Sequence, residues 1–143
     1  MFSTKRIVEF GMCDIGGILF FAKIFDLTHS AYEELVLSSN LKQNYFANKL
    51  FAMPLINTSA EFYKPIKLHQ ELEIKITVSR IGNSSFELTT KFFDETGDTK
   101  ATVITNHVFV DKVDFKKVDI PNEFKALLNL NNAIGLNINK EWE

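Results

Sequence analysis

One long amphipathic stretch, residues 20–39, constrains the fold of this chain more than any other feature. It contains neither proline nor glycine, and its apolar residues recur every three or four positions, at Phe20, Ile24, Leu27, Ala31 and Leu35. That spacing places them on one face of an α-helix. More apolar side chains flank this face, so we expect a helix that is wrapped by the rest of the protein rather than covered on one side.

Stretches that alternate apolar and polar residues make up most of the remaining chain. They cover residues 4–10 before the helix and residues 55–63, 71–79, 86–92 and about 99–111 after it. Turn sequences at residues 82–84 and 95–98 join the last three, which predicts antiparallel neighbours. One helix cannot cover five strands unless the sheet curls around it. The sequence therefore predicts an α+β protein of hot-dog architecture, with a long central helix wrapped by a curved antiparallel sheet of about five strands.

The other segments carry weaker signals. Residues 40–51 favour a short helical piece or an irregular segment, and Pro121 stands where a first helical position is expected, ahead of a short helix over residues 122–129. The asparagine-rich remainder from about residue 130 predicts a loose tail. Since no repeat or linker interrupts the chain, we expect residues 1–143 to form a single domain.

Composition excludes several classes of function. The 16 basic and 18 acidic residues are interspersed, with a formal net charge of -2, so we expect neither nucleic-acid nor membrane binding. Cys13 is the only cysteine, and the three histidines are scattered, which argues against a disulfide and against a metal site. The amino-terminal residues have no signal-peptide core, and no apolar run reaches about 20 residues, so a cytoplasmic protein is expected.

The loop ahead of the helix carries the clearest candidate for chemistry. Asp14 stands two residues before Gly16-Gly17, among small or apolar neighbours, where we expect a poorly solvated carboxylate. Adjacent glycines let a ligand approach the main chain, and the free N–H groups of a helix start can bind an anion or a developing oxyanion. A carboxylate beside such a site suggests acyl chemistry. The same residues are also ordinary turn formers, so a simple turn is the alternative.

Three groups of residues resemble the 4-hydroxybenzoyl-CoA thioesterase family of hot-dog proteins, over roughly residues 5–128. They are Phe10-Gly11-x-Cys13-Asp14-x-Gly16-Gly17-Ile18-x-Phe20-Phe21, the helix residues His29-x-Ala31-Tyr32-Glu33, and Met53-Pro54-Leu55 with Ala60 to Pro65. The resemblance implies an acyl-CoA thioesterase, that is, a hydrolase whose substrate brings its own CoA and which needs no further cofactor. It favours an aromatic acyl group, of the 1,4-dihydroxy-2-naphthoyl type found in phylloquinone synthesis or of the 4-hydroxybenzoyl type.

The same resemblance assigns roles to loop residues. It implies that Asp14 is the catalytic carboxylate, that the backbone N–H near Phe21 polarises the thioester carbonyl, and that Gly17 gives this carbonyl room. The chain departs from the family at Met12, where many members carry a second aspartate. It also departs at Phe21, where a subgroup acting on short aliphatic thioesters has a histidine.

Substrate binding and assembly complete the expectations. Phe10, Phe20, Phe21 and Phe25 offer a surface suited to a flat ring, and Gly16 is a further candidate for substrate binding. Arg80, Ser84 and Ser85 lie at a hairpin where the family tends to hold CoA phosphates. Lys64 and Lys67 are further phosphate candidates. We expect a homodimer or tetramer, because an unpaired sheet edge needs a partner. Two alternatives stay open: a non-catalytic acyl-CoA-binding or sensing protein, and a thioesterase for aliphatic acyl-CoA.

Overall fold

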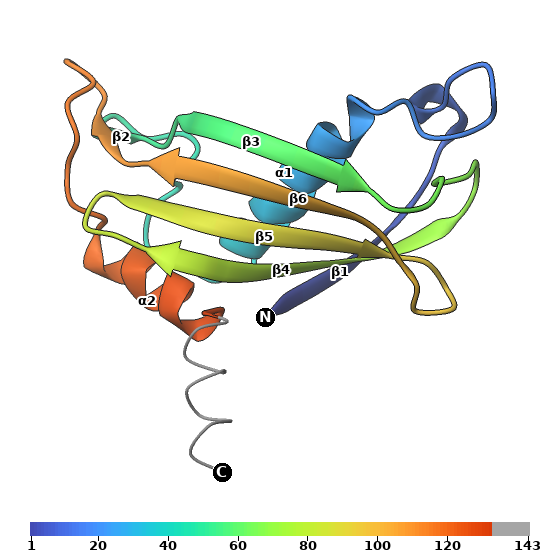
Figure 1. Ribbon diagram of the computed structural model, residues 1–143. Coiled ribbons are helices and arrows are strands. Elements are labelled where there is room, and N and C mark those ends of the chain that lie inside the picture. The colour runs from blue at the N-terminus through green and yellow to red at the C-terminus, as the bar shows by residue number, and fades with distance from the viewer. Residues whose placement is uncertain (133–143) are drawn as a thin grey trace, which may run out of the picture.

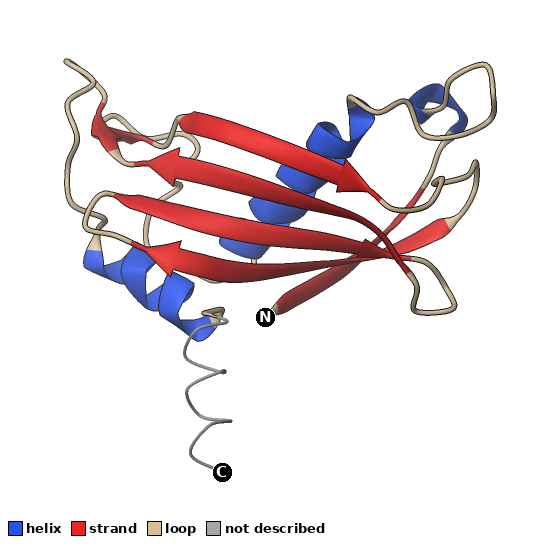
Figure 2. Ribbon diagram, viewed as in Figure 1, coloured by secondary structure: helices blue, strands red, loops and turns tan. Residues whose placement is uncertain are grey.

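In the computed structural model, which describes residues 1–132, a five-stranded antiparallel sheet curves around one helix (Figure 1). The helix α1 spans Lys23–Leu37 and crosses one face of the sheet, which is red in Figure 2. The strands lie in the spatial order β1 (Phe2–Ile7), β4 (Glu71–Ile81), β5 (Ser85–Phe93), β6 (Thr99–Val108) and β3 (Leu55–Phe62). This arrangement confirms the predicted fold class.

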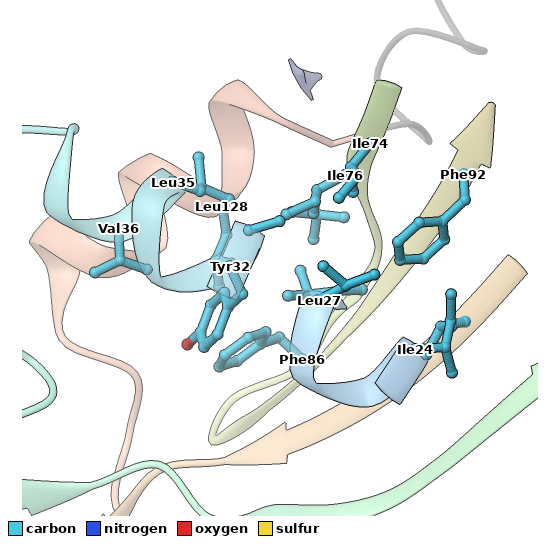
Figure 3. Close-up of a cluster of buried hydrophobic side chains, with 14 of the residues drawn as sticks. Ile24, Leu27, Tyr32, Leu35, Val36, Ile74, Ile76, Phe86, Phe92 and Leu128 are labelled. Atoms are coloured by element: carbon cyan, nitrogen blue, oxygen red, sulfur yellow. The ribbon is translucent and has the colours of Figure 1, made fainter. Parts of the chain in front are cut away.

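The core lies between α1 and the sheet because one face of each is apolar. Along β4, the side chains of Leu72, Ile74, Ile76 and Val78 are fully buried, and the residues between them are not. Figure 3 shows residues of α1 facing this row and the phenylalanines of β5. The predicted alternation over residues 71–79 is thus confirmed, and burying each such side chain contributes about 2 kcal/mol to folding.

The helix is shorter than the predicted range of 20–39. At its start, the N–H of Leu19 donates to Ile66 O and that of Phe20 donates to Met12 O, which holds the chain in an extended path until the first turn begins. At its end, the Ser39 hydroxyl donates to Leu35 O, and Asn40 adopts a left-handed φ of 55° that cannot continue a helix. The long central helix is therefore confirmed only in part.

Other segments refine the expectations. Residues 40–50 are irregular, and the strand predicted over residues 99–111 divides into β6 and a short β7 (Val110–Asp111), which pairs with β2 (Phe51–Ala52). The first strand is Phe2–Ile7 rather than residues 4–10, since a 3-10 turn, η1, occupies Phe10–Met12. The helix α2 (Asn122–Leu130) follows Pro121 as predicted. Most of the expected tail lies outside the described residues.

The two edges of the sheet differ in what they expose. The edge strand β3 exposes nearly every residue, including Leu55, Ile56 and Phe62, whereas β1 alternates between half-buried and exposed residues. An exposed edge strand with apolar side chains is a template for pairing with another strand. Within residues 1–132, none of the helices has the length and apolarity required to cross a membrane.

Candidate active site

A cavity of about 510 Å³ opens at the start of α1, at the end of the sheet where β3 finishes. One wall comes from the loop before the helix and the other from the connection between β3 and β4. The lining residues are Asp14, Ile18, Leu19, Phe20, Phe21, Phe62, Tyr63, Lys64, Pro65 and Ile66. The walls are mainly apolar and aromatic, with Asp14 and Lys64 as the charged groups, which is the usual make-up of a small-molecule site.

The Asp14 loop folds as a tight turn that needs both of its glycines. The N–H of Gly17 donates to Asp14 O at 3.1 Å, and that of Gly16 donates to the carboxylate Oδ1 at 2.8 Å. Gly17 has a φ of 77°, which disfavours other residues, and a Cβ added at Gly16 would lie 3.2 Å from Asp14 Oδ1. Asp14 is exposed to solvent in the single chain, so the expectation of a poorly solvated carboxylate is wrong for one chain.

Hydrogen bonds fix this loop to the opposite wall. The N–H of Leu19 donates to Ile66 O at 2.7 Å, and the N–H of Leu68 donates to Gly17 O at 3.1 Å. Ile18 also forms an isolated bridge with Lys67. The Asp14 loop and the β3–β4 connection are therefore joined through backbone groups directly after the Asp14 turn, at residues 17–19.

The start of α1, where Phe21 lines the same cavity as Asp14, leaves backbone donors free. Among the described residues, the N–H groups of Phe21 and Ala22 donate to no protein acceptor, and Ala22 caps the helix without a side-chain hydrogen bond. The positive end of the helix dipole adds to the attraction of these donors for negative charge. A carboxylate and free N–H groups at one apolar cavity form an arrangement suited to acyl transfer.

The structure brings together only some of the predicted site residues. Asp14, Phe20 and Phe21 line the cavity, with Gly16 and Gly17 in its loop. Phe10 points away into solvent with 79% of its surface exposed, and Phe25 lines a separate cavity farther along α1.

The predicted phosphate-binding residues lie elsewhere. Arg80, Ser84 and Ser85 are at the β4–β5 turn, at the opposite end of the sheet from the Asp14 loop (Figure 1). There the Arg80 guanidinium donates to Ser85 Oγ and to Asn106 Oδ1, each at 3.1 Å. A single chain does not bring these residues to the Asp14 cavity, so their role in binding CoA stays a prediction.

Sequence reasoning assigned no role to most of the second wall. Phe62 and Tyr63 are exposed aromatic residues at the end of β3, and they line the cavity together with Pro65 and Ile66. The available signal was the pair of aromatic residues directly before Lys64-Pro65, where a strand must end. Lys64, one of the phosphate candidates, lies at this wall and forms an ion pair with Asp98 at 2.8 Å.

His107, which lies outside this cavity, is buried, and its pKa reports on that burial. Burial, together with the nearby His29, lowers the pKa of His107 from 6.5 to about 4. Between these two pH values the unfolded chain binds a proton at His107 that the folded chain does not. The contribution of His107 to stability is therefore fully present above pH 6.5 and is lost as the pH drops to about 4. The gap in pKa corresponds to about 3 kcal/mol of unfolding free energy.

We therefore expect the unfolding free energy of the wild type, minus that of His107→Phe, to decrease from pH 7 to pH 4. The decrease arises because only the wild type loses stability through this histidine, and urea denaturation measures it. His69→Asn, at an exposed turn, is the matched control and should leave this profile unchanged. A difference that stays constant with pH would contradict the lowered pKa of His107.

Comparisons with known proteins identify relatives of this chain. The chain is 30% identical to a 1,4-dihydroxy-2-naphthoyl-CoA hydrolase of Nostoc punctiforme over 91% of its own length and 88% of the relative. It is also 30% identical to the protein of that name from Thermosynechococcus vestitus, over 87% of this chain and 86% of the relative. A crystal structure of a 1,4-dihydroxy-2-naphthoyl-CoA thioesterase from Synechocystis superimposes with a TM-score of 0.83 at 25% identity, covering 90% of this chain and 95% of that one.

A family model matches residues 8–128, a range that contains the Asp14 loop, α1 and the whole sheet except β1. This range nearly coincides with the segment over which the sequence resembles hot-dog thioesterases. The family expected from the sequence is thereby confirmed, and the chain belongs to the thioesterase-like superfamily.

Proposed function

We propose that this protein is an acyl-CoA thioesterase that hydrolyses an aromatic acyl-CoA to the free acid and CoA. The observation that carries the proposal is the cavity at the start of α1, where Asp14 and the free N–H of Phe21 lie among aromatic side chains. The relatives named as 1,4-dihydroxy-2-naphthoyl-CoA hydrolases support an aromatic acyl group, and we place a 1,4-dihydroxy-2-naphthoyl or 4-hydroxybenzoyl ester first among substrates.

The proposed mechanism uses two groups of the chain. The thioester carbonyl oxygen accepts a hydrogen bond from the Phe21 N–H, which, with the helix dipole, stabilises the oxyanion as it forms. The Asp14 carboxylate either attacks the carbonyl carbon directly or takes a proton from an attacking water. In both routes water is consumed, the carbon–sulfur bond breaks, and CoA leaves as the thiol. No cofactor is needed beyond the CoA of the substrate.

A panel of thioesters tests the activity. Release of free thiol from aromatic and aliphatic acyl-CoAs is measured with a chromogenic thiol reagent at fixed enzyme concentration. A thioesterase releases thiol in many turnovers from at least one ester. Binding of the same esters without any thiol release would instead favour the alternative, a sensing or carrier protein of this fold.

We further propose that two chains pair through the exposed edge of β3. Ile56 on β3 and Ile7 on β1 are each 55% exposed, one on each edge strand, so they provide a matched pair of variants. Light scattering at micromolar concentration should give the mass of two chains or of four. Ile56→Glu should shift the mass towards one chain, because a carboxylate is costly to bury in an interface, and Ile7→Glu should not.

A monomeric wild type that hydrolyses its ester at micromolar concentration would refute the pairing. An equal effect of Ile56→Glu and Ile7→Glu would refute the use of β3. Either result leaves the proposed thioesterase activity intact, because the thiol-release measurement tests that activity separately.

A further inference from the structure

The second wall of the Asp14 cavity is held by one residue, Lys100, which lines no part of that cavity. The Lys100 carbonyl oxygen accepts hydrogen bonds from the N–H of Tyr63 at 2.8 Å and from that of Lys64 at 3.3 Å. The Lys100 side chain donates from Nζ to Pro65 O at 3.3 Å. Three consecutive residues of the wall are therefore bonded to a single residue near the start of β6.

Lys100 belongs to a buried ion pair. Its Nζ lies 3.4 Å from Asp94 Oδ2, and the two side chains are 10% and 8% exposed. Every other ion pair within residues 1–132 leaves both of its side chains at least 26% exposed. Removing two charges from water costs about as much free energy as their attraction returns, so a buried pair adds little net stability. What this pair does supply is a fixed position for the Lys100 ammonium beneath the wall.

Asp94 is the fixed end of the pair, because the β5–β6 turn folds around its carboxylate. Asp94 Oδ1 accepts hydrogen bonds from the Thr96 hydroxyl at 2.7 Å, from the Thr96 N–H at 2.9 Å and from the Asp98 N–H at 3.0 Å. These bonds, that of the Thr96 hydroxyl first, lower the pKa of Asp94 from 3.8 to about 2. The turn lies at the same end of the sheet as the Asp14 loop (Figure 1). The second wall is thus anchored, through Lys100, to a turn of defined geometry.

The position of this wall affects the aromatic lining of the cavity more than it affects the carboxylate. Phe62 and Tyr63, whose side chains line the cavity, directly precede the segment that Lys100 holds. Asp14 is held separately, since the N–H groups of the two glycines that follow it donate to its own carbonyl and carboxylate oxygens. Loss of the Lys100 side chain should therefore displace the rings and leave the reacting group in place.

We propose that Lys100, paired with Asp94, is a positioning residue that sets the second wall against the ring of an aromatic acyl group and so determines the affinity for aromatic esters. Lys100 touches no substrate and acts through Tyr63 and Pro65, to which it is bonded. The inference rests on the proposed thioesterase function and deepens it, because it names a determinant of acyl specificity that lies outside the lining of the cavity.

The test removes both charges of the pair together. Lys100→Met alone would leave the Asp94 carboxylate buried without its counter-charge, which is strongly destabilising. The double variant Asp94→Asn/Lys100→Met avoids this, and the asparagine oxygen can still accept the hydrogen bonds of the β5–β6 turn. The methionine fills a similar volume but has no donor for Pro65 O. Urea denaturation of the variant establishes that it is folded under the conditions of the assay.

The expected result is a change in KM without a change in kcat. For 4-hydroxybenzoyl-CoA, the double variant should raise KM about tenfold, the effect of losing one well-placed aromatic contact. Its kcat should change less than about twofold, because a wall that binds the ring equally in the ground state and the transition state contributes only to affinity. KM for acetyl-CoA, which has no ring, should also stay within about twofold of the wild-type value.

Glu73→Gln/Lys75→Met is the matched control. This ion pair on β4 also spans 3.4 Å, but its side chains are 40% and 33% exposed and line no part of the Asp14 cavity, so KM should not change. Asp94→Asn alone, which leaves the Lys100 amine in place, should raise KM for the aromatic ester about threefold, and it gives the same measurement if the double variant does not fold. Variants that lower the free energy of unfolding and keep the wild-type KM would overturn the assignment.

A binding measurement separates this inference from the proposed activity. Benzyl-CoA is a thioether without a carbonyl group and cannot be hydrolysed. In calorimetric titrations the double variant should bind it about tenfold more weakly than the wild type does, and should bind CoA alone equally well. If no ester is hydrolysed but this loss is found, the thioesterase proposal fails and the role of Lys100 stands. If esters are hydrolysed and both proteins bind benzyl-CoA alike, or if CoA alone loses as much affinity, the role of Lys100 fails alone.

Discussion

Asp14→Asn is expected to lower the turnover of the best aromatic acyl-CoA by at least about a hundredfold while the protein stays folded and binds the ester. The substitution preserves the turn, because the amide oxygen of asparagine can still accept the hydrogen bond that the Gly16 N–H donates to Asp14 Oδ1 at 2.8 Å. It removes the negative charge required both for attack on the carbonyl carbon and for accepting a proton from water. Losing one oxyanion donor costs other enzymes about a hundredfold or more, and losing the attacking group should cost at least as much.

Two further variants bracket this result. Asp14→Glu should also be poor, since one added methylene displaces the carboxylate by about the 1 Å that positioning does not tolerate. Asp26→Asn is the matched control: Asp26 is an exposed carboxylate in the first turn of α1, paired with Lys23 at 3.5 Å, and it lines no part of the Asp14 cavity. Its turnover should stay within about twofold of wild type. Hydrolysis by Asp14→Asn within about threefold of wild type would contradict a catalytic role for Asp14 and favour the alternative that the loop is a simple turn.

Aromatic acyl-CoAs should exceed acetyl-CoA and butyryl-CoA in kcat/KM by about a hundredfold. Phe20, Phe21, Phe62 and Tyr63 line the cavity beside Asp14, and burying a ring-sized apolar group against such walls contributes roughly 3 kcal/mol that an acetyl group lacks. A difference of that size in transition-state binding corresponds to about two orders of magnitude in kcat/KM.

The measurement is the specificity constant for thiol release across naphthoyl, benzoyl, butyryl and acetyl esters under one set of conditions. Phe62→Ala should narrow the ratio of aromatic to aliphatic values, whereas Phe115→Ala, at an exposed turn far along the chain, should not change it. Larger specificity constants for acetyl-CoA or butyryl-CoA than for the aromatic esters would favour the alternative of an aliphatic acyl-CoA thioesterase.

The sequence predicted those parts of the site that are close together along the chain. Asp14, the glycine pair and Phe21 lie within eight residues, so local turn and helix geometry is enough to place them at one point. The fold was predictable for a related reason, because strand alternation and one long amphipathic helix leave few ways to bury the apolar faces of both. These inferences need no knowledge of how distant segments meet.

What could not be predicted depends on contacts between distant segments. The wall formed by residues 62–66 meets the Asp14 loop because backbone hydrogen bonds join the β3–β4 connection to that loop. The pattern of side chains along a sequence does not reveal which backbone groups will bond to each other. Arg80 and Ser85 were assigned by family likeness to a binding role, and in the single chain they lie at the other end of the sheet.

The backbone bonds of Leu19 to Ile66 and of Leu68 to Gly17 have a consequence for how such an enzyme can change. They secure the Asp14 turn to the facing wall without using any side chain, so the position of this turn does not depend on which residues line the cavity. Phe20, Phe62 and Tyr63 can then be exchanged for larger or smaller side chains, and the acyl group accepted can shift, while Asp14 and its glycines stay in place. New specificities are thus open to this scaffold through point substitutions alone, with no loop to rebuild.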